Sequence, residues 1–455
     1  MRDSGRDSGT SGDHELVESP DDHGTHSRAT AYLTSDVPGI GGRLRERPED
    51  FLVDEIPAYE PTGADRGNTG TEHIAMLVQK IGLSTMEMVE VIAKHFGVRR
   101  NDVGYAGLKD KHAITRQVVT VHVPGKKIED FPMLEHEKIG ILWADYHANK
   151  LKPGHLKGNR FSIRIRGVNF ARVREAKIVL DRLARLGVPN RVGEQRFGLL
   201  ENNHEIGAAL VAADFDKVIA LLLGPDARHP EVNAEARRLF AGGDLAGAIH
   251  AFPRNARAEQ AALRALIRGG SSRQAVLAID RSMLSFYVSA LQSAVFNALL
   301  DERLAAGTIA SIEPGDLAFK HDNGAVFAVD EATAADPETI ARLGRHEISP
   351  SGPMWGGEMT RAAGAVGDRE AAALARLGVS VEQLETFSKF GPRGLVDGKR
   401  RPYRVPLMNH DCEGGLDEHG PYVRVVFDLP RGAFATAVLP EIMKTGQGES
   451  GIRHS

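Results

Sequence analysis

Cysteine is almost absent from this chain of 455 residues, which contains only Cys412. A single cysteine excludes an internal disulfide framework and any zinc site built from several thiolates. Long apolar runs are also missing, because no stretch approaches the ~20 consecutive apolar residues that a membrane span needs. We therefore expect a cytoplasmic protein without a membrane segment.

The chain also lacks an excess of charge of one sign. It has 57 Lys and Arg against 61 Asp and Glu, so its bulk charge does not indicate a nucleic-acid-binding protein. It contains no Gly-x-x-x-x-Gly-Lys-Ser/Thr phosphate loop, no Gly-x-Ser-x-Gly elbow and no His-Glu-x-x-His motif. The 18 histidines are scattered, without the spacing of a metal site. We expect neither a metal nor a cofactor.

The composition that remains is that of a globular protein. With 42% apolar residues the chain can bury a sizeable core, and its length suggests two or three domains. The beginning is an exception, because the first thirty residues hold seven acidic side chains and few apolar ones. This predicts a disordered tail over residues 1–35, and residues 446–455 are expected to be a flexible end.

Strand patterns occupy both ends of the globular part, and helical patterns occupy its middle. The strand patterns lie at 51–56, 73–80, 118–123, 160–166 and 422–427, and helical spacing occurs at 205–223, 233–248, 256–267 and 283–304. This order predicts an α+β protein in which a helix-rich insertion interrupts a sheet domain. The sheet domain comprises residues 36–186 and 396–445, and the insertion comprises residues 187–395.

Basic residues are concentrated in two places. Between Tyr146 and Arg174 the chain has eight Lys and Arg and no Asp or Glu, and Lys399-Arg400-Arg401 with Arg404 forms a second cluster. Such clusters suit a phosphate backbone. A solvated strand or helix face has the same composition, so charge alone leaves polyanion binding open.

The densest polar segment runs from Gly104 to Gln117, between a predicted helix and a predicted strand. It is therefore a loop, where functional residues concentrate. Asp110 stands in it between Lys109 and Lys111. Nearby cations favour the ionised carboxylate, which suits a nucleophile or a base. The alternative is a surface loop with a weak ion pair.

Five sequence blocks, in order, resemble the pseudouridine synthases of the tRNA pseudouridine synthase D (TruD) family. They are Arg45-Glu46-Arg47-Pro48-Glu49-Asp50-Phe51, Ala106-Gly107-Leu108-Lys109-Asp110-Lys111-His112-Ala113-Ile114-Thr115, Leu156-Lys157-Gly158-Asn159-Arg160-Phe161, Pro189-Asn190 through Gly193-Glu194-Gln195-Arg196-Phe197-Gly198, and Leu429-Pro430-Arg431-Gly432-Ala433-Phe434-Ala435-Thr436. The resemblance implies a catalytic domain with a mixed or antiparallel sheet, interrupted by a TruD-type insertion, with RNA bound between them. It also implies conversion of a uridine in RNA, typically uridine 13 of tRNA, to pseudouridine by a monomer without cofactor or metal.

The resemblance also implies roles for individual residues. It makes Asp110 the catalytic aspartate. The residues implied to bind the substrate or to support Asp110 are Arg45, Phe51, Asn159, Phe161 and Phe434. The residues expected to line the RNA cleft are Lys109, Lys157, Gln195, Arg196 and Phe197.

Other interpretations stay open. Phe161 alternates with Ile163 and Ile165, which by itself predicts a core residue. An RNA-binding or RNA-chaperone module is the competing class of function, and a pseudouridine synthase with a different RNA target is a further alternative. The carboxylate of Asp110 favours the enzyme, because among phosphate-binding cations it weakens the local field.

Overall fold

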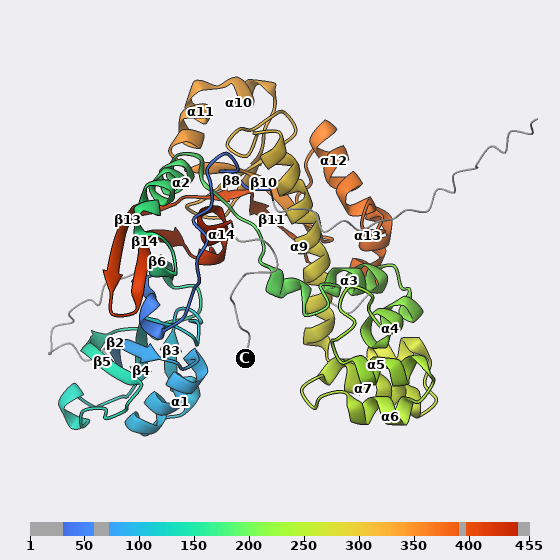
Figure 1. Ribbon diagram of the computed structural model, residues 1–455, viewed down its shortest axis with the longest axis horizontal. Helices are drawn as coiled ribbons and strands as arrows, with labels where there is room; N and C mark the ends of the chain where they lie inside the picture. The colour runs from blue at the N-terminus through green and yellow to red at the C-terminus, as the bar shows by residue number, and fades with distance from the viewer. Residues whose placement is uncertain (1–30, 59–71, 391–396, 445–455) are drawn as a thin grey trace, which may run out of the picture.

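The computed structural model describes residues 31–58, 72–390 and 397–444, which form two arms joined at an apex (Figure 1). One arm carries a mixed sheet, and the other carries the helices of the insertion. Most of the predicted tail 1–35 and all of the predicted flexible end 446–455 lie outside the described residues. The boundary of the tail needs a correction, because Thr34 is buried and donates its hydroxyl to the buried Glu441.

The arm with the mixed sheet corresponds to the catalytic domain that the resemblance implies, and we call it the catalytic arm. Its strands pair in the order β13-β14-β6-β1-β4-β2-β5, and β3 is also paired to β4. β1 is parallel to β4 and antiparallel to β6, so the sheet is mixed. Its strands are β1 Phe51–Pro57, β2 His73–Ile81, β3 Val103–Tyr105, β4 Ile114–His122, β5 Ile139–His147, β6 Leu156–Arg166, β13 Met408–Asp417 and β14 Gly420–Pro430.

Two hydrophobic clusters fill this arm. Helix α1 (Thr85–Phe96) packs its Met88, Val89 and Ile92 on the strands at one end of the sheet. Helices α2 (Val173–Leu186) and α14 (Leu439–Met443) pack at the other end. Ser84 is the N-cap of α1, and Gly97 ends the helix with φ +66°.

The insertion consists of a helical arm and a smaller apical unit. The helices of the arm are α3 Asn203–Val211, α4 Phe215–Leu223, α5 Ala234–Ala241, α6 Leu245–Ala251, α7 Arg257–Ile267, α8 Ser272–Leu277, α9 Arg281–Ala305, α12 Gly364–Ala375 and α13 Val381–Phe390. The apex holds the sheet β11-β10-β8-β9 and two short helices. Their bounds are β8 Leu317–Lys320, β9 Val326–Ala328, β10 Ile348–Met354, β11 Lys399–Pro402, α10 Glu331–Ala335 and α11 Pro337–Gly344.

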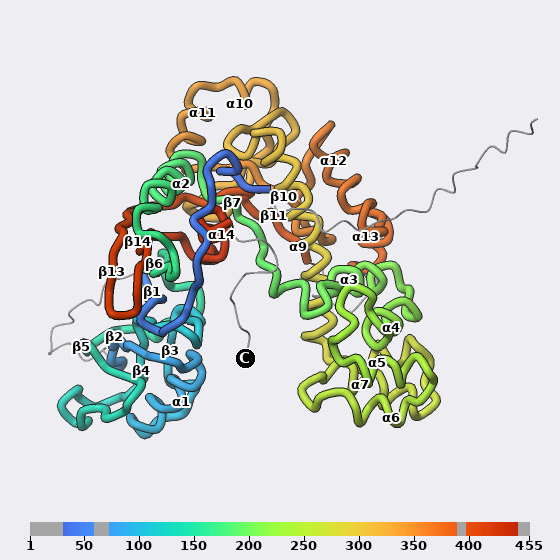
Figure 2. The backbone as a smooth tube through the Cα atoms, viewed as in Figure 1, coloured from blue at the N-terminus to red at the C-terminus, as the bar shows by residue number. Residues whose placement is uncertain are grey.

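The chain enters and leaves the insertion through two paired strands. β7 (Val188–Pro189) is antiparallel to β12 (Arg404–Val405), so the outgoing and returning segments lie side by side. Figure 2 shows this crossing near the apex and the N-terminal segment running along α14. The crossing places the two halves of the sheet domain within one continuous sheet.

Among the described helices, α9 is long and apolar enough to cross a membrane by length and composition. Its Val288, Leu291 and Val295 are instead buried in the largest hydrophobic cluster of the insertion. α9 is therefore placed as the central core helix of that arm.

Candidate active site

Asp110 lies on a loop between β3 and β4 that is fixed at several points. The backbone N–H of Lys109 donates to Thr85 Oγ1 at 2.8 Å, and Lys80 Nζ donates to the backbone carbonyl of Asp110 at 2.7 Å. The N–H of His112 donates to Asp110 Oδ1 at 3.0 Å. These bonds come from the start of α1, from β2 and from the loop itself, so the position of the carboxylate is held from three directions.

The second carboxylate oxygen of Asp110 is paired with Arg45. Arg45 Nη2 donates to Oδ2, and the two side chains keep 23% and 32% of their surface exposed. Arg45 has φ +58°, a left-handed conformation that non-glycine residues seldom adopt. Its guanidinium stands 4.6 Å from the ring centroid of Phe51, which is buried. Phe51 thus supports the cation that faces Asp110 and is not open to a ligand in this conformation.

Lys109 differs from its expected role. Its Nζ lies 2.6 Å from Glu55 Oε2, and both side chains are almost fully buried. Burial raises the pKa of Glu55, and the neighbouring Lys109 offsets that rise only in part. Lys109 is therefore held by Glu55 beneath the loop in this conformation, and its expected place in an RNA cleft stays a prediction.

Lys80 is a functional candidate that the sequence did not single out. It is fully buried in β2, and its Nζ donates to the carbonyls of Leu83 and Asp110 at 2.6 and 2.7 Å. Burial lowers its pKa to about 8, although the nearby Asp110 charge acts in the opposite direction. In the sequence it is one lysine at the end of an apolar run, so no local signal distinguished it.

Asn159 and Phe161 lie on β6, next to β1. Phe161 is 6% exposed and sits between Val53 of β1 and Phe427 of β14, with its ring 5.5 Å from that of Phe427. It is a core residue here, as the alternation predicts. Asn159 is half-buried, and its Oδ1 has no hydrogen-bond partner among the described residues. Buried polar atoms are almost always paired, so this acceptor is suited to a donor from a ligand.

Two large apolar side chains of this arm are exposed. Phe434 is 66% exposed in the turn between β14 and the short helix Ala435–Ala437, and Leu108, two residues before Asp110, is 72% exposed. Large apolar side chains in such positions suit contact with a base. Of the aromatics implied by the resemblance, Phe434 is the one open to stacking.

The segment that links the arms passes beside this turn. A Cβ on Gly193 would lie 3.9 Å from Thr436 Oγ1. In the helix Glu194–Phe197, Gln195 is exposed, whereas Arg196 stands 5.0 Å from the Phe286 ring and Phe197 packs edge-on against a histidine of α3. Gln195 is therefore exposed, whereas its two neighbours are anchored on the insertion.

The two basic clusters are largely structural. Arg166 is buried and pairs with Asp50 at 2.6 Å and Asp417 at 2.8 Å. Arg400 pairs with a buried glutamate at 2.7 Å, and Arg404 donates to two backbone carbonyls at 2.7 Å. For these three arginines the structure favours the structural alternative, because their side chains are buried and already have partners. Lys157 remains exposed at the start of β6.

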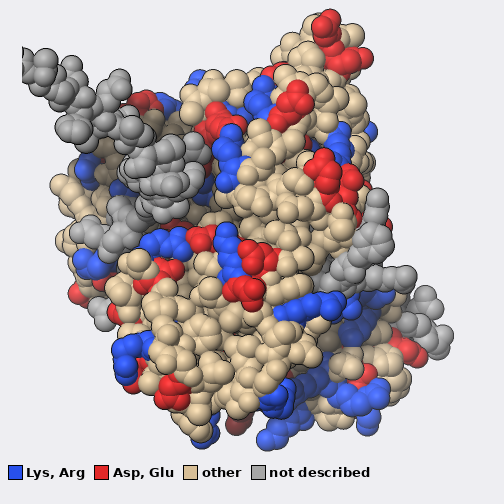
Figure 3. Space-filling model, turned by 90° about the vertical axis from the view of Figure 1, so that its right-hand side faces the viewer, with Lys and Arg blue, Asp and Glu red and all other residues tan. Residues whose placement is uncertain are grey.

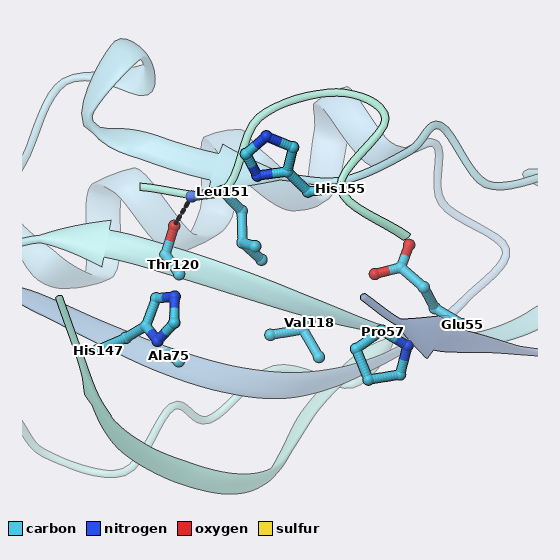
Figure 4. Close-up of a pocket in the computed structure, with 8 residues that line it drawn as sticks. All are labelled: Glu55, Pro57, Ala75, Val118, Thr120, His147, Leu151 and His155. Atoms are coloured by element: carbon cyan, nitrogen blue, oxygen red, sulfur yellow. Dashed lines mark hydrogen bonds between the residues drawn. The ribbon is translucent and has the colours of Figure 1, made fainter. Parts of the chain in front are cut away.

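A small cavity lies next to this site, on the sheet (Figure 4). Glu55, Thr120 and His147 are among the residues that line it, and its volume is about 10 Å³. That volume holds about one water molecule, so it cannot take a nucleobase. Within the described ranges, no group of three His, Cys, Asp or Glu side chains could hold a metal ion.

Comparison with known proteins decides the family. The sequence profile of tRNA pseudouridine synthase D (TruD) matches residues 28–442. The chain belongs to the tRNA pseudouridine synthase D family. The family resemblance expected from the sequence is confirmed, and with it the α+β fold and the enzyme class, a pseudouridine synthase.

Individual relatives agree over nearly the whole chain. The tRNA pseudouridine synthase D of Geobacter sp. strain M21 is 40% identical over 417 residues, covering 91% of this chain and 99% of the relative. That of Geobacter sulfurreducens is 41% identical over 416 residues, covering 91% and 96%. A crystal structure from Methanosarcina mazei, assigned to TruD, superposes with a TM-score of 0.77 at 25% identity and covers 91% of this chain and 96% of its own.

Proposed function

We propose that the protein converts a uridine of tRNA, at position 13, to pseudouridine, with Asp110 as its catalytic residue. One observation carries the proposal: a half-exposed carboxylate on a fixed loop, with one oxygen paired to Arg45 and the other held by a backbone N–H. An ion pair with an arginine favours the ionised carboxylate. An ionised, positioned and solvent-accessible carboxylate is what a nucleophile or base needs.

The reaction rearranges bonds without an external reactant. The N1–C1′ bond breaks, the uracil turns, a C5–C1′ bond forms, and the proton on C5 is replaced by one on N1. Asp110 serves either by attacking C1′ or by abstracting the 2′ proton. Both routes require the carboxylate charge, so the pair with Arg45 supports either.

Binding of the base is assigned to one exposed aromatic side chain and one buried, unpaired acceptor. Extruding a nucleotide from folded RNA costs a few kcal/mol, and one stacking contact returns about 1–3 kcal/mol. Phe434 is exposed for such stacking, and Asn159 Oδ1 offers an acceptor for a base N–H. We assign RNA contact to Lys157 and Gln195, which are exposed.

Pseudouridine mapping of tRNA from cells that lack the protein tests the proposal. The native protein, added without cofactor, should restore one pseudouridine at position 13, and Asp110→Asn should restore none while binding tRNA within a few-fold of the native affinity. Modification at another nucleotide would correct the target. Tight binding without any modification by the native protein would instead favour an RNA-binding module.

A second experiment separates the two chemical routes. Deuterium at C2′ of the target uridine slows the reaction severalfold if Asp110 abstracts that proton during the rate-limiting step. The same substitution leaves the rate nearly unchanged if Asp110 attacks C1′. Single-turnover measurement keeps product release out of the comparison.

We also propose that the protein acts as a monomer in the cytoplasm, without a metal. The support for a monomer is that every residue assigned above comes from the same sheet domain or from the linker beside it, so the site needs no residue from a second copy. Size-exclusion chromatography with light scattering tests the monomeric state, activity in the presence of a chelator tests the absence of a metal, and fractionation of cells tests the location.

A further inference from the structure

Six arginines cluster in the sequence of the insertion arm. They are Arg254, Arg257, Arg264, Arg268, Arg273 and Arg281, all exposed, with only Glu259 and Asp280 as acidic residues in the same segment. In the part of the chain that the structure describes, none of the six has a carboxylate oxygen within ion-pair distance, 4.0 Å. Asp280 instead caps α9 by accepting a hydrogen bond from the N–H of Ser282.

Other exposed arginines of the insertion behave differently. Arg238 pairs with Glu235 at 2.8 Å, and Arg369 and Arg376 pair with glutamates 313 and 302. Their side chains remain 69%, 46% and 52% exposed, so exposure alone does not prevent pairing. The absence of partners along α7 and its flanks is therefore a local property of this surface.

Three of the six share one face of a helix. Arg257, Arg264 and Arg268 are separated by seven and then four residues along α7 and its C-cap. At 100° per residue they fall within about 40° of one another, and they span about 16 Å along the axis. The nearest polar contact, from Arg264 to Gln260 Oε1 at 3.1 Å, is with a neutral amide. We call these three residues the arginine stripe.

The stripe belongs to the free end of the insertion arm. In Figure 1, α5, α6 and α7 lie at the end away from the apex, opposite the end of the catalytic arm that carries α1 and β3. Figure 3 shows the face on this side, on which basic side chains gather at the lower right and acidic ones are scattered over the rest and among them. The helix that carries the stripe therefore lies on the other arm from the loop of Asp110.

We propose that the arginine stripe binds the phosphate backbone of the substrate RNA at a point remote from the target uridine. The inference rests on the proposed function for the identity of the RNA. Three observations support it: the three arginines form no ion pair within 4.0 Å among the described residues, although Arg257 adds to the hydrogen bonds of Ser282 in lowering the pKa of Asp280; they share one face; and the segment contains no lysine. The planar guanidinium binds phosphate oxygens in a bidentate manner, which an ammonium group cannot do. A duplex carries one charge per about 1.7 Å of its axis, so a 16 Å stripe faces several phosphates.

The test replaces all three stripe arginines with glutamine, which removes the charges and keeps a good helix former. The matched control, Arg238→Gln with Arg369→Gln and Arg376→Gln, makes the same change of net charge at arginines that already have partners. Affinity for full-length tRNA is measured as a function of salt, and turnover is measured on tRNA and on a short hairpin that carries the target uridine. Circular dichroism checks that both variants are folded.

We expect the stripe variant to lose about tenfold or more in tRNA affinity, with the salt slope reduced by about 2–3, since each phosphate contact contributes ~0.7–0.9. The control should keep its slope. Turnover at saturating tRNA, and turnover on the short hairpin, should match the native protein because the Asp110 loop is untouched. Equal losses in both variants, or no loss in either, would overturn the proposal. Affinity for tRNA is measured separately from turnover. A change in affinity therefore tests the arginine stripe even if the native protein modifies a different RNA.

Discussion

At the scale of the residue, two aromatics with the same implied role occupy opposite environments. Phe161 is 6% exposed inside the sheet core, and Phe434 is 66% exposed beside the linker. The resemblance identified both positions, but a sequence match does not report burial. The alternation of Phe161 with Ile163 and Ile165 did predict its burial, because a one-sided apolar face of a strand must be covered.

These environments predict different effects when each phenylalanine is replaced by alanine. Phe161→Ala should destabilise the protein by about 3–5 kcal/mol, because it leaves a cavity in the core. Phe434→Ala should leave the free energy of unfolding within about 0.5 kcal/mol and weaken RNA binding or raise KM by about tenfold, through one lost stacking contact. Urea unfolding and steady-state kinetics measure the two effects. Strong destabilisation by Phe434→Ala would mean that the side chain packs in solution.

Lys80 gives a pH-dependent prediction. Because burial lowers its pKa in the folded state to about 8, the unfolded chain binds more protons than the folded chain between about pH 8 and 10.5. Stability contributed by this residue therefore rises with pH across that window. The charged groups that act on Lys80 are Asp110, Lys109 and Glu87.

The comparison with Lys80→Met isolates this contribution. The free energy of unfolding of the native protein, relative to the variant, should increase from pH 8 toward pH 10 and should be constant below pH 7.5. The variant should also lose activity by about 10–100-fold, because the carbonyl of Asp110 loses its donor and the loop loses one of its anchors. A difference in stability that does not change with pH would show that Lys80 keeps an ordinary pKa in the fold.

At the scale of the element, the helical patterns predicted the helices of the arm but not the breaks between them. The pattern at 205–223 forms two helices, because Ala213 adopts φ +58° and Asp214 then caps α4. The pattern at 233–248 is divided in the same way, by Gly243 at φ +82° followed by the cap Asp244. An Asp before an apolar run is a signal for the start of a helix, and this signal could have located both breaks. Alanine in a left-handed conformation carries no such signal, since tertiary packing imposes it.

The elements around Arg45 are joined by a buried charge cluster. Arg166 of β6 pairs with Asp50, which ends the short helix Pro48–Asp50, and with Asp417 of β13. Arg45 lies three residues before that helix, so the cluster fixes the segment that carries it. The sequence presented Arg166 as one of a row of exposed arginines, because spacing alone does not show which face of a strand is covered.

Breaking this cluster should be costly. Arg166→Ala leaves the buried Asp50 without its ion-pair partner and leaves Asp417 with only the more distant Arg164. Removing one member of a buried ion pair costs about 3–5 kcal/mol. Arg164→Ala is the control on the same strand, because Arg164 is 34% exposed and lies 3.9 Å from Asp417. It should change the free energy of unfolding by less than about 1 kcal/mol. Urea unfolding of both variants checks the difference, and equal effects would place Arg166 outside the buried cluster in solution.

At the scale of the whole molecule, the change of composition along the sequence predicted the two-part organisation. The relative position of the two parts could be learned only from the structure. Residues far apart in the chain form the joint. Arg404, on the returning strand, donates to the carbonyl of Leu186 at the end of α2 and to that of Leu343 in α11, both at 2.7 Å. His346 adds a bond to Ala184 O at 2.9 Å. The joint thus ties the last turn of a catalytic-arm helix to the apical unit of the insertion.

This joint predicts a variant whose defect lies in the arrangement of the arms. Arg404→Met keeps an unbranched side chain but removes both bonds to the helix ends, so the angle between the arms should vary more widely. Small-angle X-ray scattering should show a broader distance distribution, and KM for tRNA should rise about tenfold. Turnover on a short hairpin, which needs only the catalytic arm, should stay near the native value. Arg345→Gln, at an exposed ion pair of the same apical unit, is the control. If the scattering profile of Arg404→Met is the same as that of the native protein, the paired strands β7 and β12 hold the arms in place without the hydrogen bonds of Arg404.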